Sequence, residues 1–152
     1  MRVRFIKIVL AALVGNITIT LYLVISNMLL HSMHADVVLR RLLQWDASQA
    51  LGQSAFSGGW PAALLGFAMD MAVSLAWAAV FSVLLSRVRA ARHLWSLGAA
   101  FGVVVMLVMM YGVIPFGAGP PFKPDVPTFL NIMVAHTLFF GVPVAVTIGQ
   151  PS

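Results

Sequence analysis

The sequence of residues 60–85 is WPAALLGFAMDMAVSLAWAAVFSVLL. A helix crosses the hydrocarbon core of a bilayer with roughly 20 apolar residues, so this run is long enough to span a membrane. Its one charged side chain is the carboxylate of Asp70. Because a charge at bilayer depth is costly, we expect Asp70 to have a partner, a water-filled cavity or a function.

Three further apolar runs occupy about residues 5–30, 94–116 and 128–148. Hydrophobic residues make up 61% of the 152-residue chain and charged residues only 9%. Soluble domains carry about 25% charged residues, so this chain cannot cover a folded surface with charge, and we expect membrane lipids to surround it. The sequence therefore predicts an all-α membrane protein, a single domain over residues 1–152 with four transmembrane helices.

The start of the first run has the features of a signal peptide, because a basic stretch precedes the apolar residues. The apolar part nevertheless continues to Leu30, which is longer than the apolar part of a signal peptide. We therefore interpret the first run as a retained transmembrane helix.

The basic residues near the ends of the runs predict the orientation of the chain. One side carries Arg2, Arg4, Lys7, Arg87, Arg89 and Arg92, and the other side carries Arg40, Arg41 and Lys123. Cytoplasmic loops are the more basic ones, so both termini are expected in the cytoplasm. The net charge of +5 is explained by this topology and by anionic lipid, and we expect no nucleic-acid binding.

The outer side of the predicted bundle carries a helix and a stiff loop. In residues 35–46 one helical face holds Ala35, Val38, Leu39, Leu42, Leu43 and Trp45, and the other face, continued to Ser48, holds Asp36, Arg40, Arg41, Gln44 and Ser48. This amphipathic helix is expected to lie in the outer interface of the membrane or to cap the bundle. Asp46 interrupts the apolar face, which predicts that the helix ends near it. The loop 117–127 contains four prolines and should be extended and rigid.

Asp70 and His136 lie at similar distances, roughly 14 Å, from the outer ends of their spans. These two spans run in the same direction, so the two residues share a level, with Asn16 near it and Ser74 one turn from Asp70. The sequence predicts a buried polar layer of these four residues. An Asp–His pair there either fixes the helix register or holds a proton, an ion or a ligand, and both interpretations stay open.

A polar stripe follows one face of the first span and comprises Asn16, Thr20, Asn27, His31 and His34. It either lines a path toward the outer side or holds helices together. His31 and His34 are spaced to share a face, so they can bind copper or zinc, and the alternative is that both are solvated.

The remaining cofactor to consider is haem. Only His136 lies deep, so no two histidines match in depth for a haem within one chain, and a haem shared with another subunit stays an alternative. The chain has no cysteine, which excludes disulfides and cysteine-based metal sites.

Glycine and proline predict local features of the last two spans. Gly98 and Gly102 form a small-x-x-x-small pattern, which permits close approach of another helix. Pro115 and Pro143 should bend their helices, and Pro143 releases the carbonyl of Phe139 from its helical hydrogen bond.

Three motifs occur in the same two spans: residues 101–105 (FGVVV), 111–115 (YGVIP) and 135–141 (AHTLFFG). They combine a Tyr/Phe-Gly helix, an outer proline and a His-x-x-x-Phe-Gly helix. With these motifs the second half resembles small, uncharacterised four-helix proteins of the bacterial inner membrane. The resemblance implies that location and brings no established activity.

The sequence contains no nucleotide-binding loop, no Gly-x-Ser-x-Gly and no His-Glu-x-x-His, which favours a non-catalytic protein. The leading hypothesis is an accessory or structural subunit that packs against other membrane proteins or a second copy. One alternative is a small proton- or ion-coupled transporter that uses Asp70, His136 and Asn16. The other is a metal- or haem-linked redox protein that uses His31 or His34.

Overall fold

The computed structural model describes residues 2–87 and 93–149, and these residues form helices and no strand. The α-helices are α1 (Arg2–His31), α2 (Ala35–Leu51), α3 (Gly59–Arg87), α4 (Leu94–Leu107), α5 (Val126–Val134) and α6 (Val142–Gly149). Short 3₁₀ helices cover η1 (Gly52–Phe56) and η4 (Ile114–Phe116), and π-helices cover η3 (Val108–Val113) and η5 (Ala135–Gly141).

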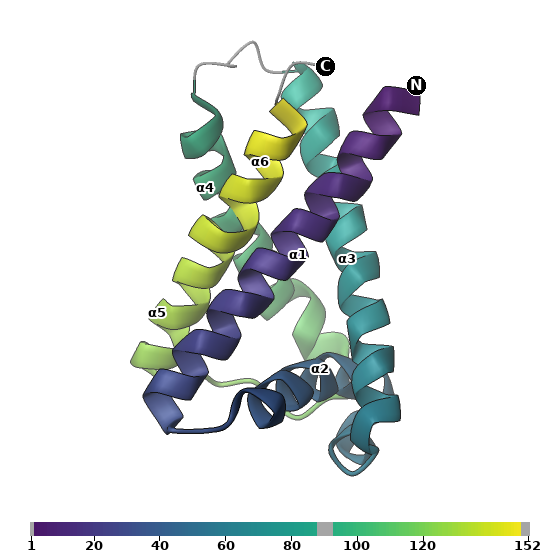
Figure 1. The fold of residues 1–152 in the computed structure, drawn as a ribbon, viewed down its shortest axis with the longest axis vertical. Coiled ribbons are helices and arrows are strands. Elements are labelled where there is room, and N and C mark those ends of the chain that lie inside the picture. The colour runs from purple at the N-terminus through teal and green to yellow at the C-terminus, as the bar shows by residue number, and fades with distance from the viewer. Residues whose placement is uncertain (1, 88–92, 150–152) are drawn as a thin grey trace.

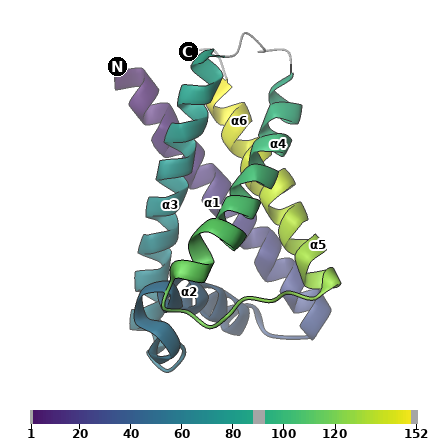
Figure 2. The same ribbon diagram turned by 180° about the vertical axis from the view of Figure 1, so that it is seen from behind.

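The long helical segments of the chain stand side by side, and α2 crosses one end of them (Figure 1). The first turns of α1 and the last turns of α6 lie at the opposite end of the bundle. Seen from behind, α4 packs beside the segment that α5 and α6 form, and α2 again closes the lower end (Figure 2).

The predicted fold class is confirmed as far as four long apolar helices are concerned. Four helical segments are long and apolar enough to cross a membrane: Phe5–His31, Gly59–Arg87, Leu94–Phe116 and Val126–Gly149. Large apolar side chains such as Leu29, Leu64 and Leu138 are exposed on their outer faces, which is the pattern that lipid requires. Arg89 and Arg92, two of the bases that predict the orientation, lie outside the described residues.

Pro115 and Pro143 each follow a π-helical turn. The turn η3 ends at Val113 and η5 ends at Gly141, in each case two residues before the proline. A proline ring collides with the carbonyl four residues earlier and cannot donate to it. Widening the preceding turn relieves that collision, and π-turns of this kind are frequent at functional sites.

The carbonyl of Phe139, four residues before Pro143, has a partner on another helix. The hydroxyl of Thr18 on α1 donates a hydrogen bond to it. The ring of Phe139 also stacks on Tyr22, with ring centroids 4.3 Å apart. In a bilayer a free carbonyl has no water to bind, so Thr18 satisfies the group that the proline releases and ties α1 to η5.

The helix α2 is longer than predicted and is packed against the bundle. It continues past Asp46 to Leu51 and ends at Gly52, whose φ of 62° suits a residue without a Cβ. Two residues of its polar face, Gln44 and Ser48, are buried, and Gln44 donates a hydrogen bond to the carbonyl of Gly59. The predicted end near Asp46 is wrong because that side chain faces a cavity inside the protein, so a carboxylate there does not interrupt the helix.

Glycines allow the closest helix contacts. A Cβ on Gly66 of α3 would collide with the carbonyl of Leu43 on α2, and one on Gly102 of α4 would collide with the carbonyl of His136. A Cβ on Gly98 would also come too close to the backbone of Gly141 and Val142, as the small-x-x-x-small pattern predicts.

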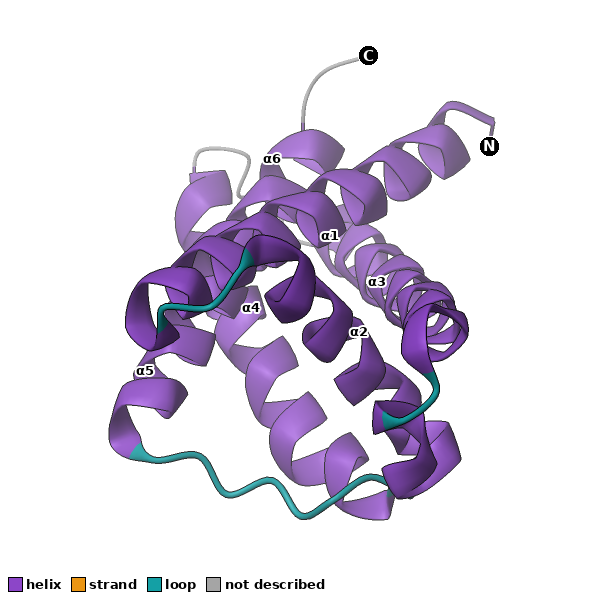
Figure 3. Ribbon diagram, turned by 60° about the horizontal axis from the view of Figure 1, so that its bottom comes forward, coloured by secondary structure: helices purple, strands orange, loops and turns teal. Residues whose placement is uncertain are grey.

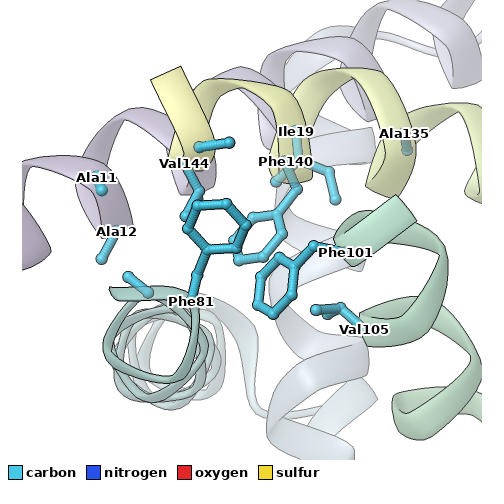
Figure 4. Packing of buried hydrophobic residues seen from close by; sticks show 11 residues of the cluster. Ala11, Ala12, Ile19, Phe81, Phe101, Val105, Ala135, Phe140 and Val144 are labelled. Atoms are coloured by element: carbon cyan, nitrogen blue, oxygen red, sulfur yellow. The ribbon is translucent and has the colours of Figure 1, made fainter. Parts of the chain in front are cut away.

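The hydrophobic core lies where α1, α3, α4 and the last span meet. Phe81, Phe101 and Phe140 pack together at its centre, with small alanines of α1 beside them (Figure 4). The rings of Phe81 and Phe101 meet edge to face, with centroids 4.8 Å apart. This core occupies the half of the bundle away from α2, and the half nearer α2 contains a cavity.

Candidate functional site

A cavity of about 630 Å³ lies between the four spans and α2. Its walls come from α1, α2, α3, α4 and the last span, and most of the lining is apolar. The polar side chains that face it include Asp46, Asp70 and His136. A volume of this size is typical of sites that hold a small organic molecule.

Asp70 is held by the polar layer that the sequence predicts. Asn16 of α1 donates a hydrogen bond from Nδ2 to Oδ2 of Asp70 at 2.6 Å, and the same nitrogen lies 3.3 Å from Oγ of Ser74. Asn16 and Ser74 are buried. The amide therefore fixes one carboxylate oxygen of Asp70, while the side chain still faces the cavity.

Asp46 is the site residue that the sequence interpretation missed. It lies on α2 and faces the same cavity as Asp70. Burial raises the pKa of the Asp46 carboxyl well above its ordinary value of 3.8, and the nearby carboxylate of Asp70 raises it further. Among the described residues Asp46 has no hydrogen bond or ion pair. The only sequence signal was a carboxylate on the apolar side of an amphipathic helix.

His136 lies on η5 and faces the cavity from the last span. Its Nδ1 lies 2.9 Å from the carbonyl oxygen of Ile132. A carbonyl only accepts, so Nδ1 carries the proton and Nε2 keeps its lone pair. His136 can therefore accept a proton or a hydrogen bond at Nε2.

Asp70 and His136 face one cavity without touching each other. Within residues 2–87 and 93–149, no hydrogen bond or ion pair joins them. Asp70 is instead bonded to Asn16, and its carboxylate interacts electrostatically with that of Asp46. The site is thus a pair of carboxylates with a histidine on another wall, rather than a direct Asp–His pair.

Some residues of the polar stripe on α1 line the cavity, and others bond to a neighbouring helix. Thr20, Asn27 and His31 line the cavity, whereas Asn16 bonds across to α3. Within residues 2–87 and 93–149 Asn27 donates only to the carbonyl of Leu23 on its own helix, so it joins no two of the described helices. The stripe therefore lines the cavity toward α2 and connects helices at its deep end.

The two candidate metal ligands are separated. His31 lines the cavity, whereas His34 is exposed at the start of α2 and is not part of the lining. In the described part of the chain no group of three or more His, Cys, Asp or Glu side chains is placed to hold a metal ion. For a haem, the deep part of the described bundle offers one axial ligand, His136, where two histidines at matching depth are needed.

The wall formed by α2 and the outer loop is aromatic. The rings of Trp45 and Phe122 lie 5.2 Å apart, and Phe56 lies 6.4 Å from Trp45 on the other side. The loop is fastened to α2 because the backbone N–H of Ala118 donates to the carbonyl of Gln49 at 2.8 Å. Figure 3 shows α2 and the adjoining loops from this end of the molecule.

Comparison with known proteins gives no relative for this arrangement. No family model matches the chain, and neither a curated protein nor a solved structure shows significant similarity to it. The fold and the cavity define the class, a helical membrane protein with an acidic internal cavity.

Proposed function

We propose that the protein is a small proton- or ion-coupled transporter whose binding site is the cavity beneath α2. The observation that carries this proposal is the position of two carboxylates, Asp46 and Asp70, in one cavity with His136. Structural polar pairs in membrane proteins satisfy each other, and Asp46 has no such partner among the described residues. A cavity between apolar helices that holds two carboxyl groups without a basic partner in the described helices fits a proton or cation pathway.

The chemistry of exchange follows from the two carboxylates. Neighbouring carboxylates disfavour joint ionisation, so either a proton or a bound cation must offset the second negative charge. The other titratable or charged side chains on the cavity walls are His136, His31 and the exposed Arg41. A cation that enters can displace a proton from the pair, and His136 Nε2 can receive it.

The placement of the protein belongs to the same proposal. We infer a bacterial inner membrane with both termini in the cytoplasm, so that α2 lies in the outer interface over the cavity. The exposed indoles of Trp60 and Trp95, near opposite ends of the spans, suit the two membrane interfaces, and the basic residues at the ends of the spans support the orientation.

The test is a flux assay in liposomes that contain the purified protein and a pH-sensitive dye. Gradients of Na⁺, K⁺ and tetraphenylphosphonium are imposed in turn, and at least one should drive protons in the opposite direction. Asp70→Asn should abolish this movement, because the amide keeps an acceptor for Asn16 and loses the charge. Asp36→Asn is the matched control, since it makes the same change at an exposed residue of α2 that lies outside the cavity lining.

Two results would contradict the proposal: no proton movement with any of the three cations, or equal movement by the Asp70→Asn protein. The accessory-subunit hypothesis stays a prediction, because lipid alone can cover the exposed apolar side chains. Purification in mild detergent tests it, and a lone monomer that carries out the exchange would argue against it.

A further inference from the structure

The charge and the walls of the cavity point to the class of its ligand. We infer that the cavity binds a monovalent organic cation with an apolar, aromatic-sized body, such as a tertiary or quaternary ammonium or a phosphonium. This inference rests on the proposed function, since it concerns the same site and names what occupies it.

The first argument is charge. The chain has four acidic residues, and two of them, Asp46 and Asp70, face the cavity. Asp70 has one hydrogen bond, from the neutral amide of Asn16, and Asp46 has none among the described residues. The guanidinium of Arg41 is at the exposed edge and pairs with neither carboxylate in the described structure. In the described structure no basic side chain therefore lies between the two carboxylates, and a bound cation would supply the missing positive charge.

The second argument concerns the size and chemistry of the cation. Small divalent metal ions take about six or more oxygen ligands in a compact shell. The described residues offer no cluster of three acidic or histidine side chains, and most of the wall is apolar. A cavity of about 630 Å³ greatly exceeds a bare ion, and its mostly apolar wall suits a cation with an apolar body.

The third argument is the aromatic wall. Trp45 precedes Asp46 in the chain and packs against Phe122, and Trp77 lines the cavity from α3, two turns from Asp70. Indole faces attract organic cations through the charge distribution of the ring, and more strongly when water is excluded. An apolar cation thus finds both its counter-charges and its packing surface in one place.

The experiment is a calorimetric titration of the detergent-purified full chain with tetraphenylphosphonium. We expect saturable binding that weakens about tenfold or more in Asp46→Asn and in Asp70→Asn, because each loses a charge in a poorly hydrated site. Asp36→Asn should bind as the unchanged protein does. Triphenylphosphine oxide, a neutral compound of related shape, should bind much more weakly, which separates charge recognition from partition into the detergent.

The outcomes separate this inference from the proposed function. Binding that depends on both aspartates, without proton exchange in liposomes, would support the ligand class and reject transport. No binding by the folded protein, with Na⁺ or K⁺ still driving Asp70-dependent proton exchange, would reject the ligand class and keep transport. Equal binding by the two variants and the unchanged protein would also overturn the inference. A circular dichroism spectrum and a single gel-filtration peak establish that each variant is folded.

Discussion

At the scale of single residues, the unusual feature is an acid on the helix that closes the bundle. Asp46 lies in a low-dielectric site near Asp70, and burial is the larger of the two causes that raise its pKa. The contrasting acid is Asp125, which caps α5 by accepting from the N–H of Thr128 at 3.0 Å. The side-chain hydrogen bond with Thr128, and next the bond from its backbone N–H, lower the pKa of Asp125, so the pKa values of the two aspartates shift in opposite directions.

The raised pKa of Asp46 predicts that acid stabilises this part of the fold. The folded protein holds the proton more tightly than the unfolded chain, so the contribution of Asp46 is fully present below its ordinary pKa of 3.8 and is lost as the pH rises through the raised value. Thermal unfolding in detergent between about pH 4 and 8 measures this slope. In Asp46→Asn the slope should be smaller, and an identical slope would show that Asp46 does not titrate in this way.

A second residue-scale prediction concerns Thr18. Replacing it with valine keeps the shape and leaves the carbonyl of Phe139 without its partner on α1. We expect Thr18→Val to lower the free energy of unfolding by about 1 kcal/mol, measured by thermal or denaturant unfolding in detergent. Thr147→Val is the matched control, because Thr147 bonds only to Pro143 on its own helix. Equal effects of the two changes would argue against a special role for the Thr18 bond.

At the scale of elements, α2 determines whether a cavity exists. It crosses α3 at Gly66, where the carbonyl of Leu43 takes the place that a side chain would need. Hydrogen bonds from Gln44 and the ring contact of Trp45 with Phe122 hold α2 between α3 and the outer loop. The crossing places Asp46 over Asp70, so the site depends on one close backbone contact.

We therefore expect Gly66→Ala to displace α2 and to destabilise the protein by about 2 kcal/mol, because rigid backbone stands where the new methyl group must fit. Binding of tetraphenylphosphonium should be lost together with stability, as calorimetry and thermal unfolding would measure. Gly112→Ala is the control, since a Cβ there meets only Val108 at an ordinary 3.7 Å. If Gly66→Ala were as stable as that control, α2 would not be held by this crossing.

At the scale of the whole molecule, the bundle has two unlike ends. One end carries α2 and the aromatic wall, and the other carries the start of α1 and the end of α6 (Figure 1). The core fills the half near the termini, and the cavity opens the half near α2. The basic residues predict that the end with α2 is the outer one, so we expect a ligand to enter the cavity from that side of the membrane.

The absence of cysteine makes this orientation directly testable. Ser57→Cys, at an exposed position between η1 and α3, should react in intact cells with a maleimide that cannot cross membranes. His93→Cys, exposed before α4, should react only after the membrane is permeabilised. The reverse pattern would place α2 in the cytoplasm and overturn the predicted topology.

The sequence by itself determined what depends on composition and spacing along one helix. The length of the apolar runs established four spans, because bilayer thickness sets the number of residues required. Counting depth along the spans put Asn16 near the level of Asp70, with Ser74 one turn away, and Asn16 donates to both of these side chains. The position of Pro143 identified the released carbonyl of Phe139.

Only the tertiary structure determined which side chains face the cavity, a neighbouring helix or lipid. An amphipathic pattern separates two faces of α2, but it does not distinguish a polar cavity from water or a buried interface from lipid. The sequence therefore predicted that the helix ends near Asp46, although this residue lies near Asp70 inside the protein. Likewise counting residues predicts His136 at the level of Asp70, but the helix that carries it places it on another wall of the cavity. Rotation and crossing are set by contacts between helices, such as Gly66 against Leu43, and these contacts have no signature within one segment.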